Sequence, residues 1–438
     1  MNCRTQAVLE LSGATYKALI SNDCSAIAPE EVALLREQGL LVAAEDNELR
    51  QVIEANRRIR MQPSLAGVCI TPTMACNFSC SYCYQGDTLA THEHAIALHT
   101  LQKGLDIYLS QLCTRYPTIK RLQVNWYGGE PLLCVDRVLD LSAWLKAHAA
   151  GWGVSLELSM VTNGYLLEKN LVGQMARLDW SWLQITLDGA REVHDRRRRH
   201  RTTGDTFNHL LSRIAYFQDF PNIGISLRVH VDQLNAPTIP VMLEQLANTG
   251  LDKLKNLSLY FAPVRSNARM CPMDALCVFS VSTFGSVESE LLKVAAAVGF
   301  RTATKPRSRI AGCSANSPAV IVVDPQGNVH KCVGSLGDQA LAVGALTEQG
   351  LHITNPTINS AWLNWSLGER CRSCNVLPLC MGGCSMQDVL GVDNRYGSIL
   401  QVAGDERCTP WRNNMGMLLA TYVDKLLQHD LRRRDSEK

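Results

Sequence analysis

The alternation of strand and helix patterns along the middle of this 438-residue chain predicts an α/β fold with a largely parallel sheet. Six short apolar runs alternate with longer segments whose apolar residues recur at helical spacing. Strands that alternate with helices form parallel sheets through right-handed crossovers, so the carboxyl ends of the strands meet at one edge. Ligands bind at that edge, and the residues after each strand are therefore the first candidates for chemistry.

The expected elements follow one another at regular intervals. The expected strands are 65–71, 122–126, 154–161, 182–187, 224–231 and 257–262, and the expected helices are 92–108, 135–148, 168–178, 206–217 and 238–248. Pro63 and Pro72 bound the first strand, because proline cannot donate to a sheet ladder. Together these spans predict six β/α repeats.

A loop with three cysteines, C-N-F-S-C-S-Y-C, directly follows the first expected strand. Its thiolates, Cys76, Cys80 and Cys83, can hold only three irons of a 4Fe-4S cube, which leaves the fourth iron open. Electron-transfer ferredoxins and structural zinc sites ordinarily use four protein ligands. Three cysteines therefore indicate an iron that binds another molecule, with a partial zinc site or a chance grouping as the alternative.

Polar motifs follow the next three strands at the same edge of the sheet. They are Y-G-G-E-P at 127–131, T-N-G at 162–164 and T-L-D-G at 186–189. Adjacent glycines expose the backbone to a close ligand, and a carboxylate suits an ammonium group. Taken alone, Gly-Gly and Glu-Pro are also ordinary turn signals.

With these motifs, residues 67–264 resemble the radical S-adenosylmethionine (SAM) superfamily. The resemblance implies a partial (β/α)6 TIM-like barrel in which the open iron chelates the amino and carboxylate groups of SAM. Reductive cleavage of SAM then gives a 5'-deoxyadenosyl radical that abstracts hydrogen from the substrate. The protein orients the cofactor and excludes water.

The same resemblance implies a set of SAM contacts. They are Tyr82, Gly128, Gly129, Glu130, Thr162, Asn163, Thr186, Asp188 and Arg228. The Gly-Gly-Glu segment corresponds to the motif that holds the SAM amino group, and Arg228 is the expected carboxylate partner. A turn cap or a solvated side chain is the alternative for the positions after the later strands. No residue stands out as a catalytic acid or base.

Seven more cysteines follow the barrel: Cys313, Cys332, Cys371, Cys374, Cys380, Cys384 and Cys408. Their spacing resembles the SPASM domain, an iron-sulfur module of several maturases. The resemblance implies one auxiliary 4Fe-4S cluster on Cys371, Cys374, Cys380 and Cys408 and a second on Cys313, Cys332 and Cys384, hence three clusters in all. A zinc ribbon is the alternative, although seven thiols fit one four-ligand site poorly.

The second auxiliary cluster lacks a fourth cysteine in this pattern. Either that iron is open, or Cys271 or Cys277 completes the site. Those two are equally well explained as buried thiols, because free cysteine behaves as a small hydrophobe. The same is expected of the cysteines without a motif, which are Cys3, Cys24, Cys69, Cys113 and Cys134.

The chain divides into five expected segments: an N-terminal unit at 1–62, the barrel at 63–265, a bridging region at 266–312, the SPASM domain at 313–415, and a helix with a tail at 416–438. The N-terminal unit is expected to contain strands at 8–11 and 40–44 and helices at 14–20, 28–39 and 48–60. Its order resembles a truncated precursor-recognition domain, with a packing extension as the alternative.

Charge and composition restrict the partners. The chain has 43 basic and 41 acidic residues, so the basic run at 194–201 does not indicate a nucleic-acid partner. No signal peptide and no run of about 20 apolar residues is present, so membrane insertion and secretion are not indicated. Seventeen cysteines then indicate metal ligation in a reducing, cytoplasmic compartment.

The SPASM resemblance implies an oxidoreductase that acts on a peptide or protein side chain. Sulfatase maturases carry an Asp after the second SPASM cysteine, whereas Val333 follows Cys332 here. The predicted function is therefore a maturase that cross-links a ribosomally synthesised precursor peptide (a RiPP) through a C–S or C–C bond, with a formylglycine-generating enzyme as the alternative. The expected partners are that peptide and a reductant such as flavodoxin or ferredoxin. A protein used only for electron transfer needs neither an open iron nor the G-G-E-P motif.

Overall fold

The structure is a computed structural model. It describes residues 1–85, 95–265, 277–302, 305–386, 389 and 408–436. In this part of the chain no helix combines the length and apolar character needed to cross a membrane.

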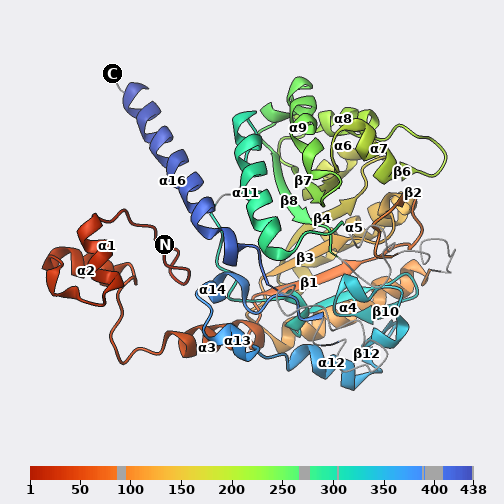
Figure 1. The fold of residues 1–438 in the computed structure, drawn as a ribbon. Coiled ribbons are helices and arrows are strands. Elements are labelled where there is room, and N and C mark those ends of the chain that lie inside the picture. The colour runs from red at the N-terminus through yellow and green to blue at the C-terminus, as the bar shows by residue number, and fades with distance from the viewer. Residues whose placement is uncertain (86–94, 266–276, 303–304, 387–388, 390–407, 437–438) are drawn as a thin grey trace.

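Six parallel strands form the centre of the fold, as the sequence predicts (Figure 1). They are β1 (Leu65–Ile70), β3 (Arg121–Trp126), β4 (Ser155–Thr162), β5 (Trp180–Thr186), β7 (Gly224–Val231) and β8 (Leu257–Pro263). Their order in the sheet is the order in the chain, and every neighbouring pair is parallel. The α/β class with its parallel sheet is confirmed.

Helices connect these strands. They are α4 (Leu98–Arg115), α5 (Val135–His148), α6 (Lys169–Arg177), α8 (Phe207–Ala215) and α9 (Ile239–Asn248). The helix expected at 92–108 is wrong in its bounds, since it begins at Leu98 and runs to Arg115, while residues 86–94 lie outside the described residues. The buried stripe Leu101, Leu105, Leu109 and Leu112 explains the late end, because apolar contacts continue one turn past Tyr108.

The C-terminal cysteine region continues the same sheet, which the sequence did not predict. β9 (Val320–Val323) pairs in parallel with β1, and β10 (Asn328–His330), β11 (Gly344–Thr347) and β12 (Gly350–Ile353) extend the sheet as an antiparallel meander. Short helices α12 (Pro356–Leu363), α13 (Glu369–Arg372) and α14 (Leu377–Cys380) follow. The expected loop-rich region is thus anchored on the edge of the barrel.

Two long helices pack against each other beside the barrel. α11 (Val281–Ala297) lies in the expected bridging region, and α16 (Trp411–Ser436) ends the described chain (Figure 1). The Asn414 side chain is fully buried between them and donates to the carbonyl of Gly285 and to Glu288. This contact joins the end of the chain to the bridging region.

The N-terminal unit contains the three expected helices, α1 (Gly13–Ile20), α2 (Pro29–Glu37) and α3 (Glu48–Met61). The strands expected at 8–11 and 40–44 are wrong, since both segments are irregular. The leucines of these two irregular segments instead pack in the apolar cluster around the buried Leu35. A two-stranded ribbon without a third strand is only marginally stable, which explains why apolar alternation alone formed no sheet here.

Candidate functional site

A cavity of about 450 Å³ opens at the carboxyl ends of the parallel strands. Ten residues predicted from the sequence line it: Cys76, Cys80, Tyr82, Cys83, Gly128, Gly129, Thr162, Asn163, Thr186 and Arg228. Two predicted SAM contacts, Glu130 and Asp188, are fully buried behind the wall and do not line it. The predicted residues are therefore brought to one place, with these two in a supporting position.

The cysteine loop is held by a small second sheet. β2 (Phe78–Cys80) pairs antiparallel with β6 (Arg198–His200), which follows α7 (Arg191–Arg197). The buried ring of Phe78 packs edge-on against the rings of Tyr165 and His200. Part of the basic run, Arg198–His200, therefore pairs with the cysteine loop and has a structural role there.

Two glycines allow the G-G-E-P turn to lie against the start of the cysteine loop. Gly128 has a φ of +132°, and a Cβ there would collide with the carbonyl oxygen of Thr73. A Cβ at Gly129 would collide with the carbonyl oxygens of Met74 and Ala75. These are close backbone approaches that only glycine permits, so both positions fix the segment that leads into the cysteine loop.

The Glu130 carboxylate ties the end of β3 to the end of β4. It accepts hydrogen bonds from the Thr162 hydroxyl (2.7 Å), the Asn163 backbone N–H (2.7 Å) and the Leu132 backbone N–H (3.0 Å). Burial raises the pKa of Glu130, although these three donors favour its carboxylate. In this structure Glu130 positions the T-N-G turn, whose Asn163 faces the cavity.

Tyr82 stands at the centre of a buried polar network. Its hydroxyl contacts the Asp188 carboxylate, accepts a hydrogen bond from Arg198 Nη1 (2.7 Å) and lies 3.3 Å from His230 Nδ1. Arg197 lies over the Tyr82 ring at 5.2 Å and forms an ion pair of 2.8 Å with Asp232. The ring next to the third cysteine is thereby fixed from both sides.

The charges of this network compensate one another. Burial disfavours ionisation of Asp188, yet the hydrogen bond and charge of His230, together with Arg198, hold the pKa of that carboxyl well below its usual range. Arg198 is itself almost fully buried, and its charge acts on Cys80 as well as on Tyr82. A positive group thus lies inside the wall that carries the thiols.

Two tyrosines connect this cavity with the C-terminal cysteine region. The hydroxyls of Tyr84 and Tyr127 are 2.9 Å apart, and Tyr84 also donates to the carbonyl oxygen of Val333 at 3.2 Å. Val333 directly follows Cys332. Residues of both predicted cofactor regions therefore meet at one edge of the cavity.

Several of the later cysteines lie near one another. The charges of Cys313 and Cys384 both act on Cys332, and those of Cys371 and Cys408 both act on Cys380. A cavity of about 270 Å³ is lined by Cys313 and Cys384 of one group and by Cys380 and Cys408 of the other. None of the described cysteines is in a disulfide. Free thiols around a cavity fit the chemistry of iron-sulfur ligation.

Cys271 and Cys277 are the predicted candidates for the fourth ligand of the second auxiliary cluster. Cys271 lies outside the described residues, and the backbone of Cys277 accepts a hydrogen bond from Gln233 after β7. Cys69, which has no motif around it, is a half-buried residue on β1, and the pKa of its thiol is raised to about 12 by burial and by the charge of Cys332. It packs in the same apolar cluster as Val333.

A site for a single metal ion differs from a site for an iron-sulfur cluster. Among the residues that the structure describes, no three His, Cys, Asp or Glu side chains surround a single-ion position. Thiolates that each bind a different iron of one cube do not surround one point, so this finding does not bear on a cluster.

An open parallel sheet, a three-cysteine loop after its first strand and a Gly-Gly turn after the next define a radical SAM domain. The family model of the Radical SAM superfamily matches residues 70–221. This part of the chain therefore carries a radical SAM domain.

Two characterised proteins resemble most of the chain. The serine-type anaerobic sulfatase-maturating enzyme of Klebsiella aerogenes is 24% identical over 384 residues, which are 81% of this chain and 84% of that protein. Mycofactocin maturase MftC of Mycolicibacterium smegmatis is 24% identical over 356 residues, which are 73% of this chain and 78% of that protein.

Solved structures share the fold. The enzyme anSMEcpe with bound AdoMet and the Cp18Cys peptide superimposes with a TM-score of 0.58 at 14% identity, over 83% of this chain and 98% of that chain. SuiB of Streptococcus suis bound to S-adenosylmethionine gives a TM-score of 0.51 at 14% identity, over 92% of each chain.

The residues at this site that were not predicted from the sequence include Tyr84, Tyr127, Arg198 and His230. A signal existed for His230, because it lies two residues after Arg228 on β7 and strand alternation places both on one face. Arg198 was noted only as part of a basic run. The two tyrosines meet across distant segments, which no local pattern reveals.

Proposed function

We propose that this chain is a peptide maturase that cleaves SAM reductively and installs an oxidative C–S or C–C cross-link in a ribosomally synthesised precursor peptide. The observation that carries the proposal is the pair of linked cysteine regions. A three-cysteine loop at the carboxyl ends of the strands lies beside a second region with seven cysteines. The tyrosine pair and Val333 join them.

The residues proposed to hold the cofactors are those predicted above. Cys76, Cys80 and Cys83 would hold the SAM-binding cluster, with SAM along the wall formed by the two glycines, Thr162, Asn163, Thr186 and Arg228. When bound, the cluster and SAM supply a 5'-deoxyadenosyl radical that takes a hydrogen atom from the peptide. Glu130 and Asp188 hold the surrounding walls through their buried hydrogen bonds.

Electron balance explains the proposed auxiliary clusters. Forming a cross-link removes two hydrogens from the peptide. One is taken as a hydrogen atom by the 5'-deoxyadenosyl radical, which becomes 5'-deoxyadenosine, and the other leaves as a proton and an electron. The electron needs an acceptor, which the two C-terminal cysteine groups would hold as 4Fe-4S clusters. A flavodoxin or ferredoxin is the proposed source of the electron that starts each SAM cleavage.

A peptide as substrate is supported by the relatives, whose names describe maturation of a sulfatase and of mycofactocin. A cross-link is favoured over formylglycine by the lining of the main cavity. Its described lining contains no Asp or Glu side chain, and Val333 occupies the position where sulfatase maturases carry Asp. A carboxylate base at that place is therefore not provided by the residues described.

Formylglycine generation is the second candidate. It is favoured by the match to the sulfatase-maturating enzyme over most of both chains. Oxidation of a serine to formylglycine and formation of a cross-link each remove two hydrogens. The mass of the product therefore does not separate the two reactions. An aldehyde reacts with a hydrazine reagent, whereas a C–S or C–C cross-link does not.

The test uses the full chain, reconstituted anaerobically with iron and sulfide and reduced in the presence of SAM. Candidate substrates are short peptides encoded beside the gene and a sulfatase-derived peptide. Loss of two hydrogens without hydrazine labelling, with two residues joined in tandem mass spectra, is the expected result. Hydrazine labelling of the sulfatase peptide alone would replace the proposal with the second candidate.

A further inference from the structure

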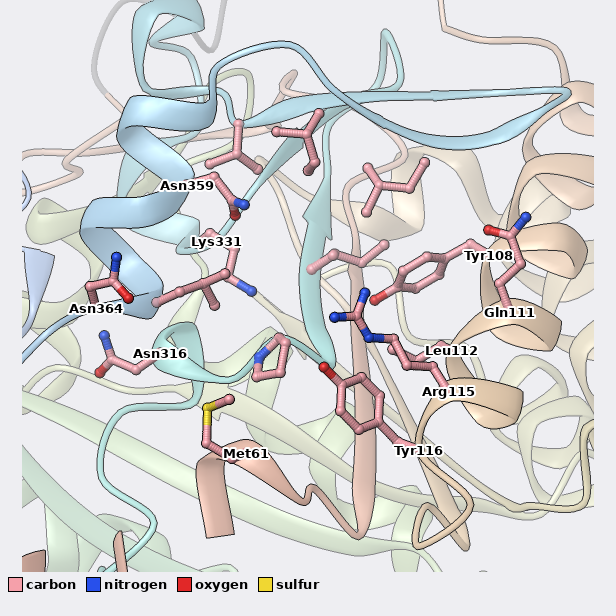
Figure 2. A pocket seen from close by; sticks show the side chains of 16 residues that line it. Met61, Tyr108, Gln111, Leu112, Arg115, Tyr116, Asn316, Lys331, Asn359 and Asn364 are labelled. Atoms are coloured by element: carbon pink, nitrogen blue, oxygen red, sulfur yellow. The ribbon is translucent and has the colours of Figure 1, made fainter. Parts of the chain in front are cut away.

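A second large pocket lies on the face of the sheet opposite the SAM site. Its volume is about 440 Å³, and it is formed between α4, the strands β9 to β12 and the end of α12 (Figure 2). Ile321 lines this pocket, whereas the next residue, Val322, packs with Met74 in the cluster that includes Tyr127. Because successive strand residues point to opposite faces, the two pockets are separated by the sheet.

Polar and cationic groups converge inside this pocket. Figure 2 shows the polar ends of Tyr108, Arg115, Tyr116 and Lys331 directed toward one space. Amide side chains contribute from Gln111, Asn316, Asn359 and Asn364. The described lining contains Arg115 and Lys331 and no carboxylate, and burial lowers the pKa of Lys331 to about 7. Its charge is therefore complementary to an anion.

Two side chains in the pocket can each donate one more hydrogen bond. The Lys331 ammonium donates to the carbonyls of Ser317 (2.6 Å) and Val320 (2.5 Å), which uses two of its three N–H groups. The Tyr108 side chain is 6% exposed, and its hydroxyl is buried without a hydrogen-bond partner in the described structure. A buried hydroxyl without a partner is unfavourable, so this hydroxyl would gain from a hydrogen-bond acceptor on a ligand.

Apolar groups at the pocket indicate what accompanies the anion. Met61 and Ile353 are 59% and 44% exposed, and both are lining residues. Ile353 belongs to β12, which is the last strand of the sheet and has no strand beyond it among the described residues. An exposed edge strand is a template for an extended peptide.

We propose that this pocket binds an extended peptide segment in which an acidic residue is flanked by apolar residues. The carboxylate would accept from Arg115, Tyr108 and the remaining N–H of Lys331, and the apolar neighbours would cover Met61 and Ile353. The inference rests on the proposed function only in taking a peptide as the partner. It places a docking site for that peptide away from the reacting atoms.

The substitutions that test this pocket must leave the cysteine region intact. Lys331 precedes Cys332, and the Asn316 backbone N–H donates to the carbonyl of Cys313, so changes at either would disturb two proposed ligands. Arg115 and Tyr108 lie on α4 and are free of this difficulty. Arg177→Ala is the matched control, because Arg177 is the last residue of α6 as Arg115 is the last residue of α4.

The probe is a fluorescein-labelled, amidated hexapeptide of alternating leucine and glutamate, and its partner probe has glutamine in place of glutamate. Binding to the anaerobically reconstituted full chain is measured by fluorescence anisotropy without SAM or reductant. We expect the glutamate peptide to bind more tightly than the glutamine peptide. Arg115→Ala should weaken its binding by about tenfold or more, and Tyr108→Phe by roughly three- to tenfold, while Arg177→Ala should bind as the wild type does.

Equal affinity for the two peptides, or unchanged affinity in both Arg115→Ala and Tyr108→Phe, would overturn the proposal. Equal competition by N-acetyl-leucine on a molar basis would show a small-carboxylate site and overturn the peptide assignment. Tyr108→Phe keeps the buried ring and removes only the unpartnered hydroxyl, so its thermal stability should not fall. Binding is measured apart from catalysis, so failure of the cross-linking proposal would show in product analysis and leave the binding result standing.

Discussion

The Arg198 guanidinium donates a hydrogen bond of 2.7 Å to the Tyr82 hydroxyl, and Arg198 stands opposite Cys80 in the paired strands β2 and β6. This relationship joins a buried positive charge to the loop that is proposed to carry the SAM-binding cluster. A nearby positive charge favours the reduced, more negative state of an iron-sulfur cluster. Arg198 is therefore a positioning residue with an electrostatic effect.

Replacement of this charge is expected to lower the reduction potential of the SAM-binding cluster. In Arg198→Gln, redox titration followed by EPR should show a lower midpoint potential, and reductive SAM cleavage should slow by about tenfold, which corresponds to about 1.4 kcal/mol. Arg199→Gln removes a charge from the next, exposed position of the same strand and should leave the potential unchanged. A shift of equal size in both variants would contradict a local effect of Arg198.

Removal of the loop cysteines is expected to abolish SAM cleavage and to leave the other clusters. The Cys76/Cys80/Cys83→Ala variant should make no 5'-deoxyadenosine and should lose about four of about twelve irons. The Cys371/Cys374→Ala variant should retain SAM cleavage and lose the peptide product. Iron and sulfide analysis with chromatography of the nucleoside products checks both. Reductive cleavage by the triple variant would refute the assignment of the loop.

A methyl group at Gly129 is expected to displace the cysteine loop. The added Cβ collides with the carbonyl oxygens of Met74 and Ala75, directly before Cys76. Overpacking of this kind costs about 1–3 kcal/mol, and here the backbone must move. Gly129→Ala should therefore lose iron from the SAM-binding cluster and SAM cleavage with it.

Gly151→Ala is the control for this substitution, because nothing lies within 4 Å of a Cβ at Gly151. That variant should match the wild type in iron content and in thermal stability. If Gly129→Ala also kept its full iron content, the close approach would not control the loop.

The sequence predicted the barrel well because the relevant signals are local. Val135–His148 and Gly224–Val231 have the predicted bounds, since helical and alternating periodicities are written in neighbouring residues. The pairing of β1 with β9 was not predictable from such patterns, because it joins segments some 250 residues apart by backbone hydrogen bonds. The same limit applies to the contact between Tyr84 and Tyr127.

The motifs predicted which residues gather at the site better than what each one does there. Gly128 and Glu130 were expected as SAM contacts, and in the structure their packing and hydrogen bonds first serve the turns beside the cysteine loop. Their role toward SAM stays a prediction. A short motif records which residue types are needed and does not separate support from contact.

Cys69, Cys271 and Cys277 are the three candidates for the fourth ligand of the second auxiliary cluster. The charge of Cys332 raises the pKa of Cys69, and Cys69 shares an apolar cluster with Val333. We expect Cys69→Ser to change the EPR spectrum of that cluster, and Cys277→Ser and Cys271→Ser to leave it unchanged. Unchanged spectra in all three variants, with a shift on addition of the peptide, would indicate an iron that is open to substrate.

The contact between α11 and α16 is expected to weaken as the pH rises. Burial raises the pKa of Glu288 to about 7 from its usual value of 4.5, and the hydrogen bond from Asn414 only partly opposes this shift. The folded protein thus binds the proton more tightly than the unfolded chain does. This contribution to stability is fully present below pH 4.5 and is lost as the pH rises to about 7, by up to about 3 kcal/mol.

Glu288→Gln removes this titration and keeps a neutral acceptor for the Asn414 amide. Its melting temperature should exceed that of the wild type at pH 8 and equal it near pH 5, because the wild-type carboxyl is neutral there. Glu290→Gln is the control, since Glu290 lies on the same helix with a side chain that is 67% exposed and paired with Lys293. Thermal unfolding of the three proteins between pH 5 and pH 8 provides the measurement. A Glu288→Gln variant that followed the wild type at every pH would show that this carboxyl ionises at no cost, and that the buried Asn414 contact does not depend on its proton.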